Sequence, residues 1–323
     1  MKRKFVWLIF ILTALFMIGC GDDGSSNESY NGPSSDNQTV NTPLLYGVGF
    51  NVPDKKANPV MMTSSLYKID AGTGAAMLIG DTGYYITGIA YNSNTKKLYG
   101  IATNMMNVKP DVKDGGILVD IEGPSSSSQL VEINMSSGEG KLIGEIKEQR
   151  YKEPVLVIDD EGGFSNPTFN STGILHAWNE SKGTVCTIDV EDGEADCGGK
   201  FKKEIIDENV VMAFDNKNLL YIMEGLKIFT MGKYDDEKEF EGMLPSNLLG
   251  VYNGDFHPLT GQFWGLYSQG VNKVEPDVKG GGDPEKEEIE GNLLIIDINE
   301  KVLMNALTVP DNINAITWVY NMF

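Results

Sequence analysis

Three acidic residues in related phrases are the strongest candidates in this chain for binding a metal ion. The phrases read Pro53-Asp54-Lys55, Pro110-Asp111-Val112-Lys113 and Pro276-Asp277-Val278-Lys279. Calcium takes about six to eight oxygen ligands, so the carboxylates of Asp54, Asp111 and Asp277 could form part of a calcium site if the fold brought them together. Their spacing matches no EF-hand loop, and acids in solvated turns are the commoner interpretation. We therefore expect no cofactor and keep calcium as the alternative.

Residues suited to catalysis are sparse. The chain has two histidines. His176 stands where other copies of an internal repeat have Tyr99, Tyr221 or Trp264, which predicts a packing role, and His257 falls at a turn. The sequence contains none of the motifs HExxH, GxSxG, Walker A or CxxC, which mark metalloproteases, serine hydrolases, phosphate-binding loops and thiol-redox sites. We expect no catalytic residue and lean against an enzyme.

The first 20 residues predict export and lipid attachment. Lys2, Arg3 and Lys4 precede an apolar run from residue 5 to residue 18, and Gly19 and Cys20 follow it. This order is typical of a secretory signal, and the run is shorter than the about 20 residues of a membrane-spanning helix. The end of the run resembles the lipobox of bacterial lipoproteins, which implies cleavage after residue 19 and diacylglycerol attachment to Cys20. An ordinary signal peptide that ends near a cysteine is the alternative.

The same resemblance implies a lipid-anchored protein of the bacterial cell envelope. Gly21 rather than aspartate follows Cys20, which favours the outer membrane over the inner membrane. Residues 20–43 consist mostly of small and polar types and predict a flexible tether. The formal net charge of −20 repels nucleic acid, so the charged partners we expect are metal ions, polyamines or basic proteins.

Cys186 and Cys197 are the cysteines that remain, and an exported chain can join them. The segment between them reads as two short strands around a turn at residues 190–193. If Ile188 faces Ala195, the same register puts Cys186 opposite Cys197, close enough for a disulfide. Two unpaired, buried cysteines are the alternative.

The chain repeats itself, and each copy reads as four short strands. The clearest copy spans residues 66–102, with glycine-containing turns between strands. The other copies cover residues 130–146 with 169–178, 185–199 with 210–223, 226–232 with 254–268, and 293–309 with 313–321. The unit resembles those of bacterial propellers built on LYxID…TG…IG…TGLAFxPxTGxLYG, which implies an all-β fold and leaves activity open.

The phase of the copies predicts a closed ring over residues 44–323. The last copy ends after its third strand, and the first ordered segment, Leu44–Phe50, reads like a fourth strand. Pairing of this N-terminal strand with the C-terminal strands would close the ring and remove exposed sheet edges. We therefore expect a β-propeller of five blades, and six blades are the alternative.

Three long connections predict a binding surface. Residues 51–64, 103–127 and 270–292 each join a fourth strand to the next first strand and carry the Pro-Asp phrases. Such connections leave one face of a propeller, and loops on a rigid scaffold often carry function. The candidate binding residues are Asp54, Lys55, Asp111, Lys113, Asp277 and Lys279. A local Pro-Asp turn without a binding role is the alternative.

The function we expect is binding of a protein or glycan partner in the envelope by this loop-rich face. One alternative is a hydrolase or lyase with its site in the central channel. If the first strands of the copies faced the channel, they would offer mainly Lys68, Glu132 and Lys227. Another alternative is a structural subunit of an envelope complex.

Overall fold

The computed structural model describes residues 42–51, 62–103, 109–113, 116–120, 127–152, 155–159, 163–197, 210–231, 239–244, 248, 250–268 and 292–320. Every described residue belongs to one compact unit, Asn41–Phe323. The described secondary structure is almost entirely β-strand, and within these ranges no apolar helix is long enough to cross a membrane.

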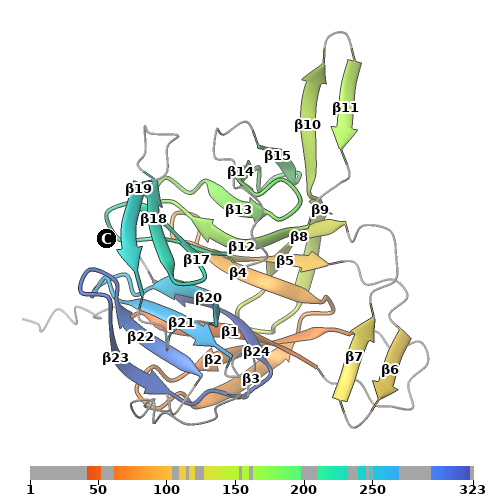
Figure 1. Ribbon diagram of the computed structural model, residues 1–323. Helices are drawn as coiled ribbons and strands as arrows, with labels where there is room; N and C mark the ends of the chain where they lie inside the picture. The colour runs from red at the N-terminus through yellow and green to blue at the C-terminus, as the bar shows by residue number, and fades with distance from the viewer. Residues whose placement is uncertain are drawn as a thin grey trace, which may run out of the picture. The chain divides into compact units, whose positions relative to one another are not determined.

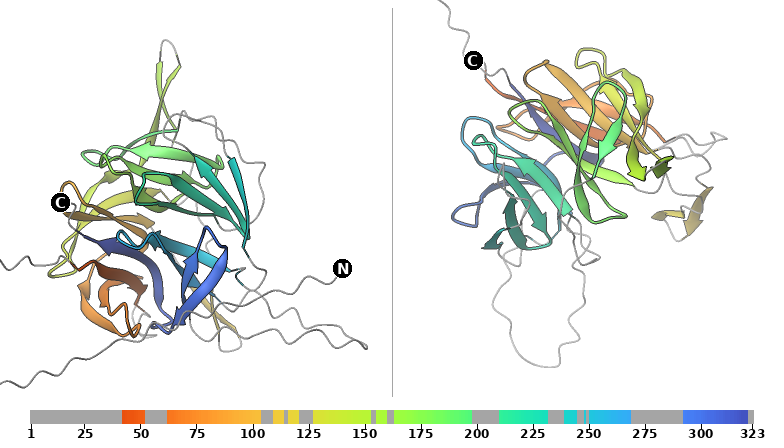
Figure 2. Two further views of the ribbon diagram at one scale, coloured as in Figure 1. Left: turned by 90° about the vertical axis from the view of Figure 1, so that its left-hand side faces the viewer. Right: turned by 90° about the horizontal axis from the view of Figure 1, so that it is seen from above.

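Five sheets form the blades of a ring (Figures 1 and 2). From inner to outer strand, blade 1 is β24 (Ile313–Val319), β1 (Leu44–Phe50), β2 (Ser64–Ile69) and β3 (Ala76–Asp81). Blade 2 is β4 (Ile86–Asn92), β5 (Lys97–Thr103), β8 (Ser128–Ile133) and β9 (Gly140–Glu145). Blade 3 is β12 (Phe164–Phe169), β13 (Leu175–Asn179), β14 (Thr184–Ile188) and β15 (Glu194–Asp196). Blade 4 is β16 (Val210–Phe214), β17 (Leu220–Glu224), β18 (Lys227–Met231) and β19 (Glu239–Met243). Blade 5 is β20 (Val251–Phe256), β21 (Phe263–Tyr267), β22 (Leu293–Asp297) and β23 (Val302–Leu307).

The inner strands surround the axis of the ring. Strand β4 contacts β24 and β12, β16 contacts β12 and β20, and β20 contacts β24, so the circle closes after five members. The prediction of a five-bladed propeller is confirmed, and the six-bladed alternative is wrong.

The N-terminal strand closes the ring as predicted. β1 lies between β24 and β2 and runs antiparallel to both, with Leu45 opposite Trp318 on one side and Ile69 on the other. Residues from the two ends of the folded unit thereby share one sheet. Both edges of β1 are hydrogen-bonded, so the closure leaves neither edge of this strand exposed.

The radial order of the strands differs from one expectation. The innermost strand of each blade is the third strand of a sequence copy, and the first strand of the next copy lies third from the axis. Lys68 on β2, Glu132 on β8 and Lys227 on β18 therefore do not face a central channel. Each copy begins on the outer half of one blade and ends on the inner half of the next.

Two hairpins extend the plan of four strands per blade. β6 (Lys109–Lys113) and β7 (Gly116–Asp120) pair within the 103–127 connection, where we expected a loop. Asp111 is paired with Leu118 there, so this copy of the phrase forms a strand and not a local Pro-Asp turn. β10 (Lys147–Lys152) and β11 (Val155–Asp159) form the second hairpin, and β10 adds to blade 3 by parallel pairing with β15 (Figure 1).

Polar residues that recur in the copies cap the outer turns. Asp70 Oδ1 accepts hydrogen bonds from the backbone N–H groups of residues 72 and 73, at 3.0 and 2.8 Å. Asn134, Asp189 and Asp297 cap the equivalent outer turns in the same way. The side chain of Asp or Asn is short enough for its oxygen to accept a hydrogen bond from the N–H two residues later in the chain. This bond satisfies a donor that the turn would otherwise leave free, and it explains why Asp or Asn recurs at this position.

A glycine in the outer turn lets neighbouring blades approach. Gly138, at φ 83°, lies against Gly80 on β3 of the preceding blade, and a Cβ on Gly138 would be 2.6 Å from the Gly80 backbone. Both the left-handed conformation and the contact exclude larger side chains. The recurring TG…IG pattern of the copies reflects this contact at the perimeter.

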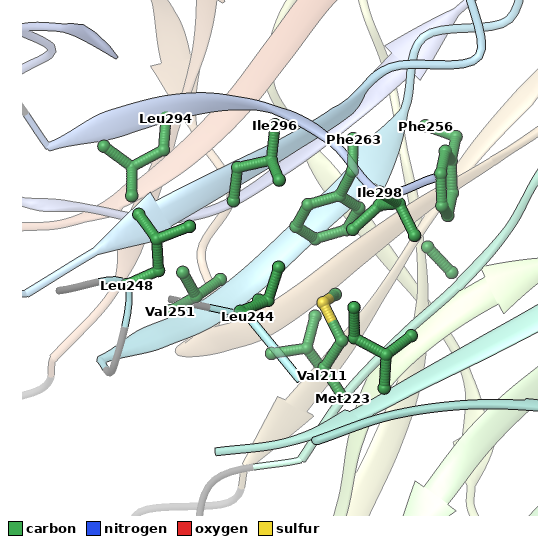
Figure 3. Close-up of a cluster of buried hydrophobic side chains, with 12 residues drawn as sticks. Val211, Met223, Leu244, Leu248, Val251, Phe256, Phe263, Leu294, Ile296 and Ile298 are labelled. Carbon is green, nitrogen blue, oxygen red and sulfur yellow. The ribbon is translucent and has the colours of Figure 1, made fainter. Parts of the chain in front are cut away.

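The core lies between blades. Figure 3 shows the cluster between blades 4 and 5, where Val211 and Met223 face Phe256, Phe263 and Leu294. At four interfaces an aromatic ring on the second strand also contacts one from the inner strand of the next blade, at centroid distances of 4.9–5.4 Å: Tyr99–Phe169, His176–Phe214, Tyr221–Phe256 and Trp264–Trp318. The packing role predicted for these positions is confirmed.

One inner turn carries a residue that strains the backbone. Lys96 has φ 58° where the equivalent turns have Gly173 and Gly261. A left-handed non-glycine residue costs about 1–2 kcal/mol, and glycine loses about 0.5–1 kcal/mol in extra chain entropy. We expect Lys96→Gly to raise the unfolding free energy by about 0.5–1 kcal/mol in urea titrations. The matched Gly173→Ala should lower it, because its Cβ would lie 2.9 Å from Asn94 Nδ2. Shifts in the same direction for both variants would contradict the assignment.

Candidate functional site

A small cavity lies where the inner strands end. All five inner strands contribute to its wall, and its volume is about 30 Å³, room for one or two water molecules. Six of the lining residues are aromatic, and the polar ones include Asp215, Asn216, Asp255, Thr168 and Thr317. The aromatic residues are Tyr91, Phe169, Phe214, Phe256, Trp318 and Tyr320. We call this the axial cavity.

Asp255 on β20 brings a carboxylate to the axial cavity. Its Oδ2 atom accepts hydrogen bonds from Thr317 Oγ1 at 2.8 Å and from the Trp318 N–H at 3.0 Å. Its Oδ1 atom accepts one from the Phe256 N–H at 2.8 Å. The carboxylate therefore links blade 5 to blade 1 and keeps part of its surface open to the cavity.

The protein around the axial cavity changes the acidity of two groups. Burial raises the pKa of Asp255 to about 6, although three hydrogen bonds to the carboxylate oppose the change. Burial, and then the charge of Asp255, raise the pKa of Tyr320 to about 12. The cavity therefore holds an acid that is ionised at neutral pH and poorly solvated.

Asp255 was missed in the sequence, although a signal is visible there. The inner strands align so that Ala90, Thr168, Ala213 and Thr317 occupy the same position as Asp255. Thr168 makes the same kind of contact, since its Oγ1 accepts a hydrogen bond from the Phe214 N–H of the next blade at 3.3 Å. The signal in the sequence is an acid at an inner-strand position where the other copies have alanine or threonine.

Asparagine side chains close the axis below the cavity. Asn253 on β20 donates to Asn166 Oδ1 on β12 at 3.2 Å, and Asn166 donates to the Val210 carbonyl at 2.6 Å. Strands β12 and β20 are not neighbours in the ring, so the first of these bonds crosses the axis. Asp215 lines the axial cavity together with Asp255, but the small volume of the cavity does not provide the deep channel that a propeller enzyme would need.

The two histidines serve the fold. His257 Nδ1 accepts hydrogen bonds from the N–H groups of Leu259 and Thr260 at 3.2 and 3.1 Å, so the ring replaces the Asn or Asp that caps the equivalent turns. His176 packs edge-on against Phe214, and burial lowers the pKa of both imidazoles.

The three long connections leave the opposite face from the axial cavity. The residues before them are anchored beside the starts of inner strands: the N–H groups of Phe50, Thr103 and Ser268 donate to the carbonyls of Asn312, Tyr85 and Gly250. The axial cavity lies at the other ends of these inner strands. We call the face that carries the connections the insertion face.

Two of the six binding candidates fall within the described residues. Asp54, Lys55, Asp277 and Lys279 lie outside the described residues, as does Cys20. Asp111 and Lys113 lie on β6. Within the described ranges, no group of three or more acidic, cysteine or histidine side chains could hold a metal ion. The calcium alternative depends on Asp54 and Asp277 and stays a hypothesis.

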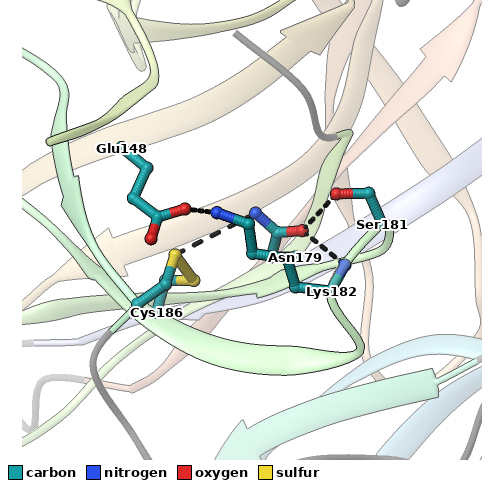
Figure 4. Close-up of a disulfide and its surroundings, with 6 residues drawn as sticks. Glu148, Asn179, Ser181, Lys182 and Cys186 are labelled. Atoms are coloured by element: carbon teal, nitrogen blue, oxygen red, sulfur yellow. Dashed lines mark hydrogen bonds and ion pairs between the residues drawn. A yellow bond between two sulfur atoms is a disulfide. The ribbon is translucent and has the colours of Figure 1, made fainter. Parts of the chain in front are cut away.

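Cys186 and Cys197 are joined in the structure, with their Cα atoms 4.2 Å apart (Figure 4). The pairing of β14 with β15 places Ile188 opposite Ala195, the register from which we predicted the bridge. Close by, Lys182 forms an ion pair with Glu148, which ties the start of β10 to the turn between β13 and β14.

A larger and more open hollow lies on blade 2. Its volume is about 650 Å³, and its wall includes Tyr84, Met135 and Lys141. Lys97 and Glu132 form an ion pair across it at 2.9 Å. Lys96, Glu139 and Lys141 also line the hollow, so it presents charges of both signs beyond this pair.

The raised pKa of Asp255 predicts an unusual pH dependence of stability. The folded state holds the Asp255 proton more tightly than the unfolded chain, so this group stabilises the fold below about pH 4 and loses that contribution as pH rises through about 6. The loss is at most about 3 kcal/mol, because the side chain is partly accessible. His257, with its lowered pKa, acts in the opposite direction below about pH 6.5.

The difference between wild type and Asp255→Asn isolates this contribution. We expect the variant to gain unfolding free energy relative to wild type between pH 4 and 7, measured by urea denaturation at each pH. His257 cancels in the comparison because both proteins contain it. A difference that is flat, or that falls over this range, would contradict the raised pKa of Asp255.

No protein-family model matches this chain, and no curated protein does. Solved structures with some similarity include a nidogen/laminin complex, with a TM-score of 0.47 and 11% identity over 87% of this chain and 100% of that one. TolB from Acinetobacter baumannii has a TM-score of 0.45 and 10% identity over 82% and 53% of the two chains. A protein of unknown function from Bacteroides caccae has a TM-score of 0.46 and 12% identity over 86% and 99%. Similarity at this level carries no information about activity.

Proposed function

We propose that this protein is a lipid-anchored component of the bacterial cell envelope whose insertion face binds a protein or glycan partner. The observation that carries the proposal is the shared origin of the three long connections, whose flanking residues lie at one end of the blades. A rigid ring that holds several long segments on one face suits recognition of a large partner. The export signal and Cys20 support the anchoring.

The closed axis supports binding over catalysis. A ligand-binding pocket in an enzyme usually encloses about 300–1,000 Å³, whereas the axial cavity has room for one or two water molecules. A hydrolase or lyase with its site in the central channel is therefore supported less well than a binding protein. A structural subunit of an envelope complex would use the same insertion face.

Shortening the connections tests the binding surface. Residues 52–61, 104–126 and 269–291 are each replaced by a short Gly-Ser linker, and a partner is identified by cross-linking in the envelope, purified, and titrated against each variant. The matched control shortens residues 199–208, which join blades 3 and 4 and lack the Pro-Asp phrase. We expect binding to be lost with the three replacements and kept with the control. A folded triple variant that binds with unchanged affinity would overturn the proposal.

Replacing Cys20 tests the anchor separately. We expect the wild-type protein to enter the detergent phase in phase partitioning and its N-terminal peptide to carry the mass of a diacylated cysteine. The Cys20→Ser variant should lose both properties and still bind the partner in solution. An unmodified Cys20 in the mature wild-type protein would rule out lipid attachment and leave the binding surface untouched.

A further inference from the structure

We propose that the axial cavity binds a primary ammonium group, such as one end of a diamine or the tip of a lysine side chain. This inference concerns the face opposite the insertion face and does not depend on the proposed function. It rests on three features of the cavity. The Asp255 carboxylate can accept a further hydrogen bond, the walls have a suitable size and chemistry, and the fold does not need the negative charge of Asp255.

The Asp255 carboxylate can accept at least one more hydrogen bond. An ionised carboxylate offers about four lone-pair sites, and the three described donors to Asp255 occupy two at Oδ2 and one at Oδ1. None of the ion pairs among the described residues involves Asp255. A buried carboxylate without a counter-ion is costly, and a bound cation would remove that cost. The ammonium group supplies both the charge and a hydrogen-bond donor for Oδ1.

The walls of the cavity suit an ammonium head group. A volume of about 30 Å³ admits an –NH₃⁺ group and excludes a quaternary ammonium. Beside the aromatic residues, the polar residues Asp215, Asn216, Thr168 and Thr317 line it, so oxygen acceptors other than Asp255 are available for the N–H donors of an ammonium group. Two acids, Asp255 and Asp215, line the cavity, and the described residues hold no group of three or more acidic, cysteine or histidine side chains suited to a metal ion. These properties select a small organic cation with three N–H donors.

The charge of Asp255 is not needed to join the blades. Thr168 occupies the same position on β12, and its hydroxyl accepts the N–H of the next inner strand. Ala90 and Ala213 occupy the position on β4 and β16 without a polar group at all. The carboxylate thus adds a negative charge at a position where the four other blades have alanine or threonine, and binding of a cation accounts for it.

Calorimetric titration of the full chain in detergent with putrescine and with methylammonium tests the proposal. At about pH 8, where Asp255 is ionised, we expect both to bind. Asp255→Asn and Asp255→Thr should weaken binding at least about tenfold, because each removes a charged acceptor. The threonine variant copies the arrangement at Thr168 and keeps the bond between blades, so its melting temperature checks that the fold is intact.

Three controls make the result decisive. Asp311→Asn removes the same charge from an exposed site and should bind as wild type does. Tetramethylammonium should not bind, since it is too large for the cavity, and Nα-acetyl-lysine amide shows whether a lysine side chain reaches the site as a free diamine does. Equal binding to wild type and to Asp255→Thr, or tighter binding of potassium than of methylammonium, would overturn the proposal.

Discussion

Leu45→Asp is expected to abolish the cooperative unfolding transition of the propeller. Leu45 is fully buried on β1, between Trp318 and Ile69. The substitution removes a packed side chain, which costs about 2–5 kcal/mol, and leaves an unpaired charge inside, which costs several more. The sum approaches the about 5–15 kcal/mol that stabilise a whole domain. Because β1 is the strand that closes the ring, the damage spreads to both of its neighbours.

Leu78→Asp provides the matched comparison. Leu78 lies on the outer strand of the same blade and is 59% exposed, so the same change should alter the unfolding free energy by no more than about 0.5 kcal/mol. Thermal melts followed by circular dichroism distinguish the two variants. If Leu45→Asp melted like Leu78→Asp, the ring would not depend on β1.

Removing the disulfide is expected to cost about 3 kcal/mol. Cys186 and Cys197 are 11 residues apart, and closing a loop of that length in the unfolded chain accounts for an effect of this size. Their bridge also fastens β15, which has only three residues and contributes little pairing of its own. We expect the Cys186→Ser, Cys197→Ser double variant to unfold at lower urea concentration than wild type.

Reductant supplies the control for this prediction. It should lower the urea midpoint of the wild type to that of the double variant and leave the double variant unchanged. A wild-type midpoint that ignores reductant, in a protein whose thiols are shown to have reacted, would contradict a stabilising role for the bridge.

The repeating turns and strands could be predicted from the sequence because their causes are local. Asp70 and Asn134 cap their turns through bonds that span two or three residues, and an alternating strand pattern needs only its own residues. The closure by β1 was also predictable, since an unmatched fourth strand at one end and a missing one at the other have few ways to pair. The point in the repeat at which the first and last copies are cut was therefore enough to predict the pairing of β1 with β24.

The radial order and the axial cavity could not be predicted in the same way. A repeat has no marked starting strand, so the pattern around Lys68 gives no sign that β2 lies third from the axis. The pairing of β10 with β15 depends on an insertion between the second and third strands of one copy. Asp255 gains its surroundings from Thr317 and Trp318, about 60 residues later in the chain, and only the closed ring brings them into contact.

The position of β1 has a mechanical consequence. If Cys20 carries the proposed lipid anchor, tension on that residue would reach the folded unit at Leu44, where β1, the strand that closes the ring, begins. β1 is hydrogen-bonded to β24 on one edge and to β2 on the other. A force along β1 must therefore break both sets of hydrogen bonds at the same time. In an anchored protein, β1 would therefore be the first strand to carry a force from the membrane, and it is hydrogen-bonded along both edges.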